Sequence, residues 1–359
     1  MGIKGFSTWL KTYAPSAVFY LPLNSFKGRR IGIDALGWLH SYLSTSKKKA
    51  IKKSDLFAND PDVGFRILCR LTGELIRYIE RLWAMEITPV FFFDGPPHPL
   101  KGGELEQRSK DNAKKLADLT QLYQQESCYP GSVDREKLYN KVVQYPHLPY
   151  EYVKSTQNTL TMLGIPWVTA DHDGEQLAAR CCAEGLISAV WSTDSDNLIF
   201  GAPLVIKGFV KGQPEVVEVT YLGEVLRASG LTQERLIDLA ILLGCDFNQH
   251  IVGMGPVKAM DLIYQYQKLE YVPGVDFNAL NYVAVREIFS HQPSMQPEWQ
   301  LTRDRFSQLG EYIFQLVPDA NKQQLMAASH AVPVAQSGHI FAPILSPNVA
   351  SSSSSAPQH

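Results

Sequence analysis

The sequence has no Cys-x-x-Cys pair, no long apolar run and no excess of charge of either sign. Its five cysteines are odd in number, so we expect a reducing compartment and neither a disulfide framework nor a zinc site. No apolar run reaches the roughly 20 residues of a membrane span, and the first residues lack the layout of a signal peptide. The net charge of −2 gives no global argument for a polyanion partner, so a nucleic-acid surface would have to be local.

What the sequence does contain is enough apolar material for a sizeable core. With 359 residues, 45% of them hydrophobic and 19% charged, the chain suits one large α/β domain or two ordinary ones. From about residue 331 the composition turns to Ala, Pro and Ser and ends in SSSSSAPQH. Such a composition predicts a disordered tail.

The stretch 189–200, AVWSTDSDNLIF, places two acids at the end of an apolar run that favours a buried strand. Carboxylates one residue apart, Asp194 and Asp196, repel each other unless a cation lies between them. A Mg²⁺ or Mn²⁺ ion would supply that charge, because these ions prefer oxygen ligands. The alternative for an isolated pair of this kind is a solvated turn in which Asp caps the next helix.

Three other predicted strands show the same arrangement. The first ends in Asp34, the second is followed by Asp94, and the third is followed by Asp173 and Glu175. These strands, 30–34, 88–93 and 165–170, alternate with helical patterns such as 61–86 and 150–163. This alternation predicts a mostly parallel, doubly wound α/β sheet, in which sites gather beyond the carboxyl ends of the strands. Helix capping explains one such acid, but four converging sets predict a metal site.

The number and kind of these side chains point to two ions. Six or seven carboxylates exceed the need of one octahedral ion, and a cluster poor in His and Cys argues against a zinc hydrolase. Two Mg²⁺ ions roughly 4 Å apart, with Mn²⁺ as a substitute, suit phosphodiester cleavage. Lys101 and Arg108, seven residues apart in a helical pattern after Asp94, are candidates to clamp the scissile phosphate.

A second constellation follows the predicted helix 233–243. Gly253-Met254-Gly255-Pro256 gives a tight turn before another helix, 256–266, with Lys258 in its first turn. This pattern predicts a helix–hairpin–helix that binds a phosphate through backbone amides, directly or through a monovalent cation, without reading sequence. The alternative is a plain Gly-containing turn. Asp246, just upstream, is a candidate seventh carboxylate.

Two polar segments leave alternatives open. Residues 47–53, KKKAIKK, suit a solvated surface loop, phosphate contacts or a nuclear-import signal. Residues 100–146 are rich in Lys, Glu and Gln, and their helical pattern suits either a solvated excursion or a mobile element over a site.

Taken together, five stretches resemble the XPG family of structure-specific 5′ nucleases over about residues 1–316. They are MGIKGFSTWL, IGIDA, VFFFDGPPHPLKGGELEQR, STDSDNLIFG and LLGCDFNQHIVGMGPVKA, in the family's order. The resemblance implies a PIN-like nuclease core with a helical arch, and a two-metal 5′ nuclease acting on flaps, nicks or junctions in DNA. It carries the metal-ligand role onto Asp34, Asp94, Asp173, Glu175, Asp194, Asp196 and Asp246.

The resemblance also implies how DNA is held. Lys101 and Arg108 take the clamp role in a helical gateway, and residues 110–146 resemble the arch that passes a single-stranded 5′ end. The candidate DNA-binding residues are Gly2, His40, Gly253, Gly255 and Lys258. Two features depart from the family: Asp173 stands where a Glu is usual, one methylene shorter, and Glu104, Glu106, Asp111 and Asp118 dilute the arch lysines. No clamp-binding motif is visible in the tail.

The sequence-based expectation is therefore a monomeric, Mg²⁺-dependent 5′ flap endonuclease or 5′–3′ exonuclease of DNA replication, repair or recombination. We expect a nuclear location, or else a cytoplasmic one, no membrane partner, and replication or repair proteins as further candidate partners. The alternatives are a weakened member that serves as a nucleic-acid-binding scaffold, and a related ribonuclease. We predict two nuclease segments, at 1–100 and 149–243, separated by a gateway at 101–148. A helix–hairpin–helix region at 244–330 and a tail at 331–359 follow.

Overall fold

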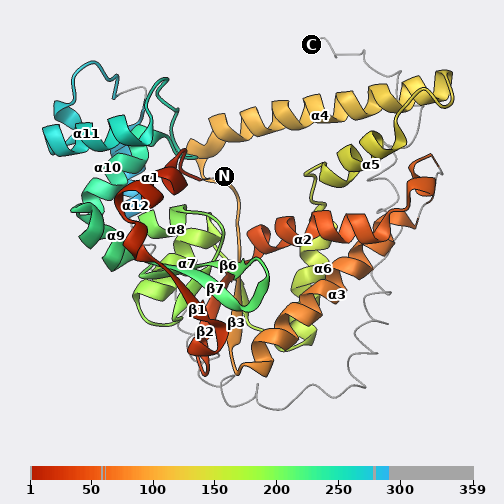
Figure 1. Ribbon diagram of the computed structural model, residues 1–359, viewed down its shortest axis with the longest axis horizontal. Coiled ribbons are helices and arrows are strands. Elements are labelled where there is room, and N and C mark those ends of the chain that lie inside the picture. Colours follow the sequence, from red (N-terminus) through yellow and green to blue (C-terminus); the bar gives the residue numbers. More distant parts are fainter. Residues whose placement is uncertain (1, 58–59, 61, 278–279, 291–359) are drawn as a thin grey trace, which may run out of the picture. The chain divides into compact units, whose positions relative to one another are not determined.

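The computed structural model describes residues 2–57, 60, 62–277 and 280–290 (Figure 1). The chain divides into two compact units. The first comprises the described parts of 1–38, 76–107 and 160–318, and the second includes 39–75 and 108–159. The sequence also predicts a helix at 303–316; this segment and the predicted tail 331–359 lie outside the described residues.

The first unit contains a sheet of seven strands in the order β1-β7-β6-β5-β2-β3-β4. The strands are β1 (Val18–Pro22), β2 (Arg30–Asp34), β3 (Thr88–Phe93), β4 (Trp167–Thr169), β5 (Ala189–Trp191), β6 (Leu204–Val210) and β7 (Gln213–Tyr221). The strands from β6 to β4 pair in parallel, whereas β7 runs antiparallel to both β6 and β1. The mostly parallel, doubly wound sheet predicted from the sequence is confirmed.

The central strands are buried because their residues are apolar on both faces, as parallel strands covered by helices require. Phe91, Phe92 and Phe93 of β3 are each at most 1% exposed. In β2, a Cβ at Gly32 would lie 2.5 Å from Ile187 Cδ1 and 2.9 Å from Phe92 Cε2. The glycine therefore lets neighbouring side chains close over the strand that ends in Asp34.

Helices of the first unit cover this sheet and continue into a helical region. They are α1 (Phe6–Tyr13), α7 (Gly174–Ala183), α8 (Asp196–Ile199), α9 (Leu222–Ser229), α10 (Gln233–Leu243), α11 (Pro256–Tyr266) and α12 (Tyr282–Ser290). Helices α10 and α11 have the bounds predicted from the sequence. Helix α1 packs on α11, where Trp9 Nε1 lies 3.3 Å from Met260 Sδ. The first residues of the chain are thus anchored to the predicted hairpin region.

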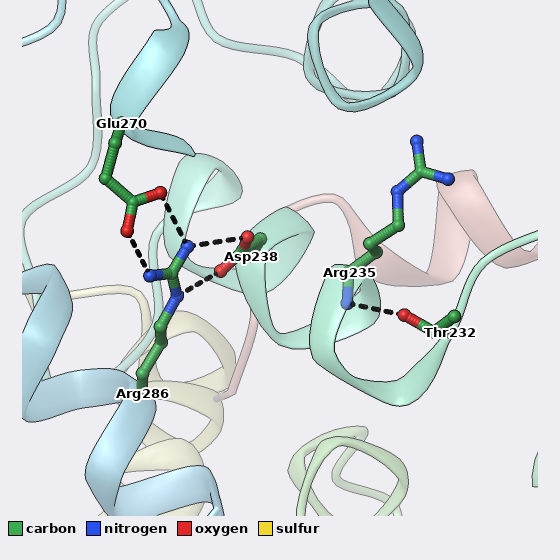
Figure 2. A network of polar contacts seen from close by, with 5 residues as sticks. All are labelled: Thr232, Arg235, Asp238, Glu270 and Arg286. Atoms are coloured by element: carbon green, nitrogen blue, oxygen red, sulfur yellow. Dashed lines mark hydrogen bonds and ion pairs between the residues drawn. The ribbon is translucent and has the colours of Figure 1, made fainter. Parts of the chain in front are cut away.

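A partly buried ion-pair network ties the helical region together (Figure 2). Arg286 of α12 donates to both carboxylate oxygens of Asp238 on α10, at 2.6 and 2.8 Å, and to Glu270 of the 3₁₀ turn Leu269–Tyr271. The Asp238 side chain is only 6% exposed. At the start of α10, Thr232 accepts the backbone N–H of Arg235 and caps the helix.

The second unit is helical. It includes most of α2 (Ala35–Ala50), α4 (Gly102–Cys128) and α6 (Tyr150–Met162), part of α3 (Val63–Ala84), and all of α5 (Arg135–Gln144). The turn from α4 to α5 is built by Glu126, whose carboxylate accepts the N–H groups of Gly131 and Val133 at 2.9 and 3.0 Å. The helical pattern predicted for residues 100–146 is therefore confirmed. Across the described residues, no helix is long and apolar enough to cross a membrane.

Two local features differ from the sequence-based expectation. With Pro15 and Pro22, the sequence after α1 suits an irregular segment, but it contains the edge strand β1, whose side chains are mostly exposed and which is defined by pairing with β7. Of the alternatives for 47–53, a loop is excluded for residues 47–50, which lie in α2; Lys47 is only 4% exposed, whereas Lys48 and Lys49 are exposed. The Lys47 ammonium donates to the Tyr145 carbonyl at 2.6 Å, and burial lowers the pKa of Lys47 to about 8.

Candidate active site

Asp34 is oriented by the turn into the helix that follows β2. Its Oδ1 accepts the Gly37 N–H at 2.9 Å, and a Cβ at Gly37 would lie 2.2 Å from Oδ2. The close approach of this backbone thus depends on glycine. Across the sheet, the hydroxyl of Ser192, which directly follows β5, lies 3.0 Å from Asp34 Oδ2.

Ser192 joins three parts of the sequence at this edge. Its hydroxyl also lies 2.7 Å from Glu175 Oε1 on α7, and it accepts the Asp194 N–H at 3.0 Å. A hydroxyl has one proton to donate. Its single proton cannot make a full hydrogen bond to both carboxylates, so Asp34 and Glu175 compete for it.

Glu175 is also fixed by the first turn of α8. Asn197 Nδ2 donates to Glu175 Oε1 at 2.9 Å, and Asn197 is fully buried. Asp196, the first residue of α8, is 4% exposed, and its Oδ1 has no hydrogen-bond partner among the described residues. A buried carboxylate oxygen without a donor is unfavourable and is the kind of atom that a cation stabilises.

The start of the chain closes over the same acids. Gly2 has a φ of 83°, and a Cβ there would lie 1.9 Å from Asp194 Oδ1 and 2.7 Å from Asp196 Oδ1. The backbone of Gly2 therefore lies against both carboxylates. Only a glycine fits this position without moving them.

Asp94 lies just beyond β3 and caps α7. Its Oδ1 accepts the N–H of Gly174, the first residue of that helix, at 2.8 Å. The turn after Asp94 is tight, because Gly95 donates its N–H to the His172 carbonyl at 2.7 Å and a Cβ at Gly95 would lie 2.1 Å from the Ala170 carbonyl. These contacts hold the ends of β3 and β4 together.

Lys101 is paired with Asp173, the residue before α7. Lys101 Nζ lies 2.6 Å from Asp173 Oδ1 and 4.9 Å from the ring centroid of Phe247. Burial alone would lower the pKa of Lys101, but the carboxylates of Asp173, Asp246 and Asp94 outweigh it and the pKa is raised. Lys101 is therefore a charged ammonium beside the acids.

The electrostatics of the cluster are unfavourable without a cation. Burial raises the pKa of Asp34 to about 6; the hydrogen bond from Gly37 opposes this shift, and the charge of Asp94 adds to it. Burial followed by repulsion from Asp194 raises the pKa of Glu175 and of Asp196 well above the usual range. Neighbouring carboxylates in a poorly solvated site disfavour each other's ionised form.

These side chains fit a hard divalent cation. Across the described part of the chain, no three His, Cys, Asp or Glu side chains stand in an arrangement that would hold a metal ion as placed. The donors are nonetheless carboxylate oxygens, which Mg²⁺ prefers. The unpartnered Asp196 Oδ1 and the crowding of Asp34 and Glu175 around one hydroxyl are the features that a cation would relieve.

The predicted helix–hairpin–helix is present between α10 and α11. Asn248 shapes its loop by accepting the Cys245 N–H and donating to the Ile241 carbonyl, both at 2.9 Å. Gly253 has a φ of 76°, and Gly255 stands at the N-cap of α11 without a side-chain cap. Lys258, in the first turn, is exposed. The residue types and the helix start that phosphate binding requires are therefore in place.

The remaining predicted residues lie in the second unit or beside the hairpin. His40 is on α2 and Arg108 is on α4, both in the second unit. The pKa of His40 is lowered, first by burial and then by the positive charges of Arg108 and Lys47. Asp246 follows α10. The pKa of Asp196 is raised mostly by burial and then by the charge of Asp194, and the charge of Asp246 adds to this shift. The structure thus brings the seven predicted acids and Lys101 into one unit.

Sequence reasoning missed the residues that connect the acids. Ser192 and Asn197 flank the Asp194-Ser195-Asp196 motif, and this adjacency was the available signal. Phe247, next to Asp246, was equally close to a predicted acid. Their roles depend on contacts with residues more than 15 positions away, which no local pattern contains.

Comparisons with known proteins show the family to which the sequence is similar. The model of the XPG N-terminal domain matches residues 1–115, and that of the XPG I-region matches residues 164–246. A flap endonuclease 1 from Caenorhabditis briggsae is 31% identical over 307 residues, which are 82% of this chain and 75% of that protein. A flap endonuclease 1 from Cryptosporidium muris is 31% identical over 81% of this chain, and the match spans 62% of that protein's length.

Solved structures share the fold. The catalytic core of Rad2 in complex with DNA substrate has a TM-score of 0.56 and 22% sequence identity, covering 91% of this chain and 86% of the Rad2 chain. At this level of identity the likeness concerns the arrangement of the chain alone.

Proposed function

Because this chain belongs to the XPG family, we propose that it is a structure-specific 5′ nuclease. It would hydrolyse phosphodiester bonds in DNA at 5′ flaps, nicks or recessed 5′ ends. The observation that carries this proposal is that Asp34 of β2 and Glu175 of α7 meet at the Ser192 hydroxyl, which also accepts the Asp194 N–H, while Asp94 beyond β3 accepts the N–H at the start of α7. Helix capping accounts for Asp94 alone, whereas burial and mutual repulsion destabilise the set as a whole.

The carboxylates would hold two Mg²⁺ ions, for which Mn²⁺ can substitute. The proposed ligands are Asp34, Asp94, Glu175, Asp194, Asp196 and Asp246, with Asp173 at the edge of the cluster. When bound, the ions supply a water nucleophile at neutral pH and stabilise the charge on the attacking and leaving oxygens. Ser192 and Asn197 orient Glu175, and Gly37 orients Asp34.

The cations of the chain would act on the substrate. Lys101 stands beside the acids with its charge retained, which supports assigning to it the contact with the scissile phosphate and the stabilisation of charge that develops there. Arg108 on α4 and His40 on α2 form a second group, which we assign to the 5′ strand of the substrate. Helices α4 and α5 would be the gateway for that strand.

Binding of the duplex is assigned to the hairpin. The amides at the start of α11, together with Gly253, Gly255 and Lys258, suit a phosphate, either directly or through a monovalent cation. Such contacts do not read the base sequence, which agrees with recognition of DNA structure. Gly2, against Asp194 and Asp196, would line the position of the scissile nucleotide. A nuclear location and a monomeric state complete the proposal.

A cleavage assay on labelled DNAs tests this function. Flap, nicked, blunt and junction DNAs of one sequence are incubated with the purified chain and Mg²⁺, and product ends are mapped. We expect cuts near the 5′ branch, none with EDTA, strong loss in Asp196→Asn and full activity in the control Glu215→Gln, an exposed acid on β7. Tight flap binding without cleavage over a Mg²⁺ and Mn²⁺ titration would indicate a scaffold, and preferential cutting of matched RNA flaps a ribonuclease.

A further inference from the structure

We propose that Asp173 is a positioning residue for Lys101 rather than a metal ligand. The inference rests on the proposed nuclease function, in which Lys101 contacts the scissile phosphate. It concerns the one position at which the acid set of this chain departs from the family pattern, where Asp stands in place of Glu.

The contact between the two residues is short and largely shielded from water. Lys101 Nζ donates to Asp173 Oδ1 at 2.6 Å, and the side chains are 19% and 10% exposed. A charge-assisted hydrogen bond of this kind holds its partners far better than an exposed surface pair does. The Asp173 carboxylate is therefore already engaged by a cation that belongs to the chain.

The start of α7 does not use the Asp173 carboxylate as its cap. Asp173 occupies the N-cap position of α7, yet its side chain makes no capping hydrogen bond. Asp94 does this instead by accepting the Gly174 N–H at 2.8 Å. Since a helix start usually uses the N-cap side chain, the supply of this cap by Asp94 allows Asp173 to turn toward Lys101.

Lys101 is held from a second side as well. Its ammonium lies 4.9 Å from the Phe247 ring centroid, within the range of a cation–π contact. The Phe247 ring is fixed edge-on against Phe289, with centroids 5.5 Å apart. Lys101 also ends a 3₁₀ turn whose start is capped by His98, which accepts the Leu100 N–H. The ammonium thus has a defined place that depends on Asp173 and Phe247.

The neighbouring acid has a different set of contacts. Glu175, two residues along, bonds Ser192 and Asn197 and shares the Ser192 hydroxyl with Asp34. The two acids at the start of α7 therefore divide their tasks: Glu175 belongs to the metal cluster and Asp173 to the lysine. The side chain of Asp, one methylene shorter than that of Glu, is consistent with this division, because it need only reach Lys101.

The first test measures metal binding without DNA, using Mn²⁺ alone and calorimetry on the full chain. Asp173→Asn is expected to change the Mn²⁺ dissociation constant by less than about 3-fold, whereas Asp196→Asn, at a proposed ligand, weakens it about 10–100-fold or more. Equal losses in the two variants would overturn the proposal and return Asp173 to the ligand set.

The second test follows Lys101 itself. An amine-reactive reagent is applied, and the rate of modification at Lys101 is read by mass spectrometry. We expect a several-fold faster reaction in Asp173→Asn than in the wild type, and wild-type rates in Glu215→Gln. An unchanged rate at Lys101 would show that Asp173 does not hold the ammonium.

The third test uses flap cleavage and a double-mutant cycle. Asp173→Asn is expected to lower kcat about 10-fold or more, and to add little to the loss caused by Lys101→Met, because both changes remove one interaction. Additive losses would contradict the proposal. If the wild-type chain cleaves no DNA, the proposed function fails, but the Mn²⁺ and modification measurements still decide the role of Asp173.

Discussion

Replacing Ser192 with alanine removes one oxygen atom from the centre of the acid cluster. The hydroxyl accepts the Asp194 N–H and contacts Asp34 and Glu175 at 3.0 and 2.7 Å. Ser192 is only 3% exposed, so water does not readily take its place. The variant therefore loses the hydroxyl that holds two proposed ligands, Asp34 and Glu175, in place relative to each other. The same hydroxyl also holds the backbone N–H of a third proposed ligand, Asp194.

The expected magnitude follows from these contacts. Loss of groups that orient metal ligands typically costs 10–100-fold in metal affinity. The Asp194 N–H is also left without its acceptor, which costs about 1–3 kcal/mol. In the metal-free protein, the hydroxyl cannot satisfy the carboxylates of Asp34 and Glu175 at once. Its removal therefore also removes one unfavourable contact, which offsets part of this cost. We therefore expect a large effect on Mn²⁺ affinity, about 10–100-fold, and a smaller one on metal-free stability.

The assay is Mn²⁺ calorimetry together with chemical denaturation in EDTA. The matched control is Ser229→Ala, which removes an equally buried hydroxyl that bonds only backbone carbonyls of its own helix. Ser229→Ala should leave Mn²⁺ affinity unchanged. Wild-type Mn²⁺ affinity in a folded Ser192→Ala protein would refute the role assigned to this hydroxyl.

Three other predictions concern the chain start, the acids and the helical region. Gly2→Ala places a Cβ 1.9 Å from Asp194 Oδ1, so Mn²⁺ affinity should fall about 10-fold. Gly103→Ala, whose Cβ meets nothing within 4 Å, should leave Mn²⁺ affinity unchanged; equal affinities in the two variants would contradict this. Because the folded-state pKa of Asp34 is raised to about 6, its penalty is present above that pH and relieved below it. Denaturation in EDTA should therefore show more stability at pH 5.5 than at pH 7.5, by about 1 kcal/mol for this group, with the difference reduced by Mg²⁺; a flat or opposite pH profile would refute it. Arg286→Met strands the buried Asp238 charge and should cost about 1–3 kcal/mol of unfolding free energy, whereas Arg227→Met, in an exposed pair with Glu224, should cost nothing measurable.

The elements that sequence reasoning placed well are those whose pattern is local and strong. Strand β3 is a run of buried aromatic residues closed by an acid, and α11 begins at a proline after two glycines, so both ends are marked in the sequence. Edge strand β1 carries no such mark. Its burial is slight, and only the distant partner β7 makes it a strand.

The site divides in the same way. Asp194 and Asp196 were predictable because a strand end and two acids fall within eight residues of each other. The pairing of Lys101 with Asp173 was not, since 72 residues separate them and the contact depends on how β3, β4 and α7 meet. Lys47 shows a local pattern that misleads. A run of lysines predicts exposed side chains, but Lys47 is buried within the second unit, where its ammonium donates a hydrogen bond to the Tyr145 carbonyl.

Flap cleavage by the wild-type chain and by Asp194→Asn tests the central claim most directly. The measurement is the initial rate on a 5′-flap DNA in Mg²⁺, with circular dichroism to establish that both proteins are folded. The account predicts cleavage at the 5′ branch by the wild type and a loss of about 100-fold or more in the variant, because one carboxylate of the metal cluster is neutralised. Equal rates for the two proteins, or cleavage by the wild type that persists in EDTA, would contradict it.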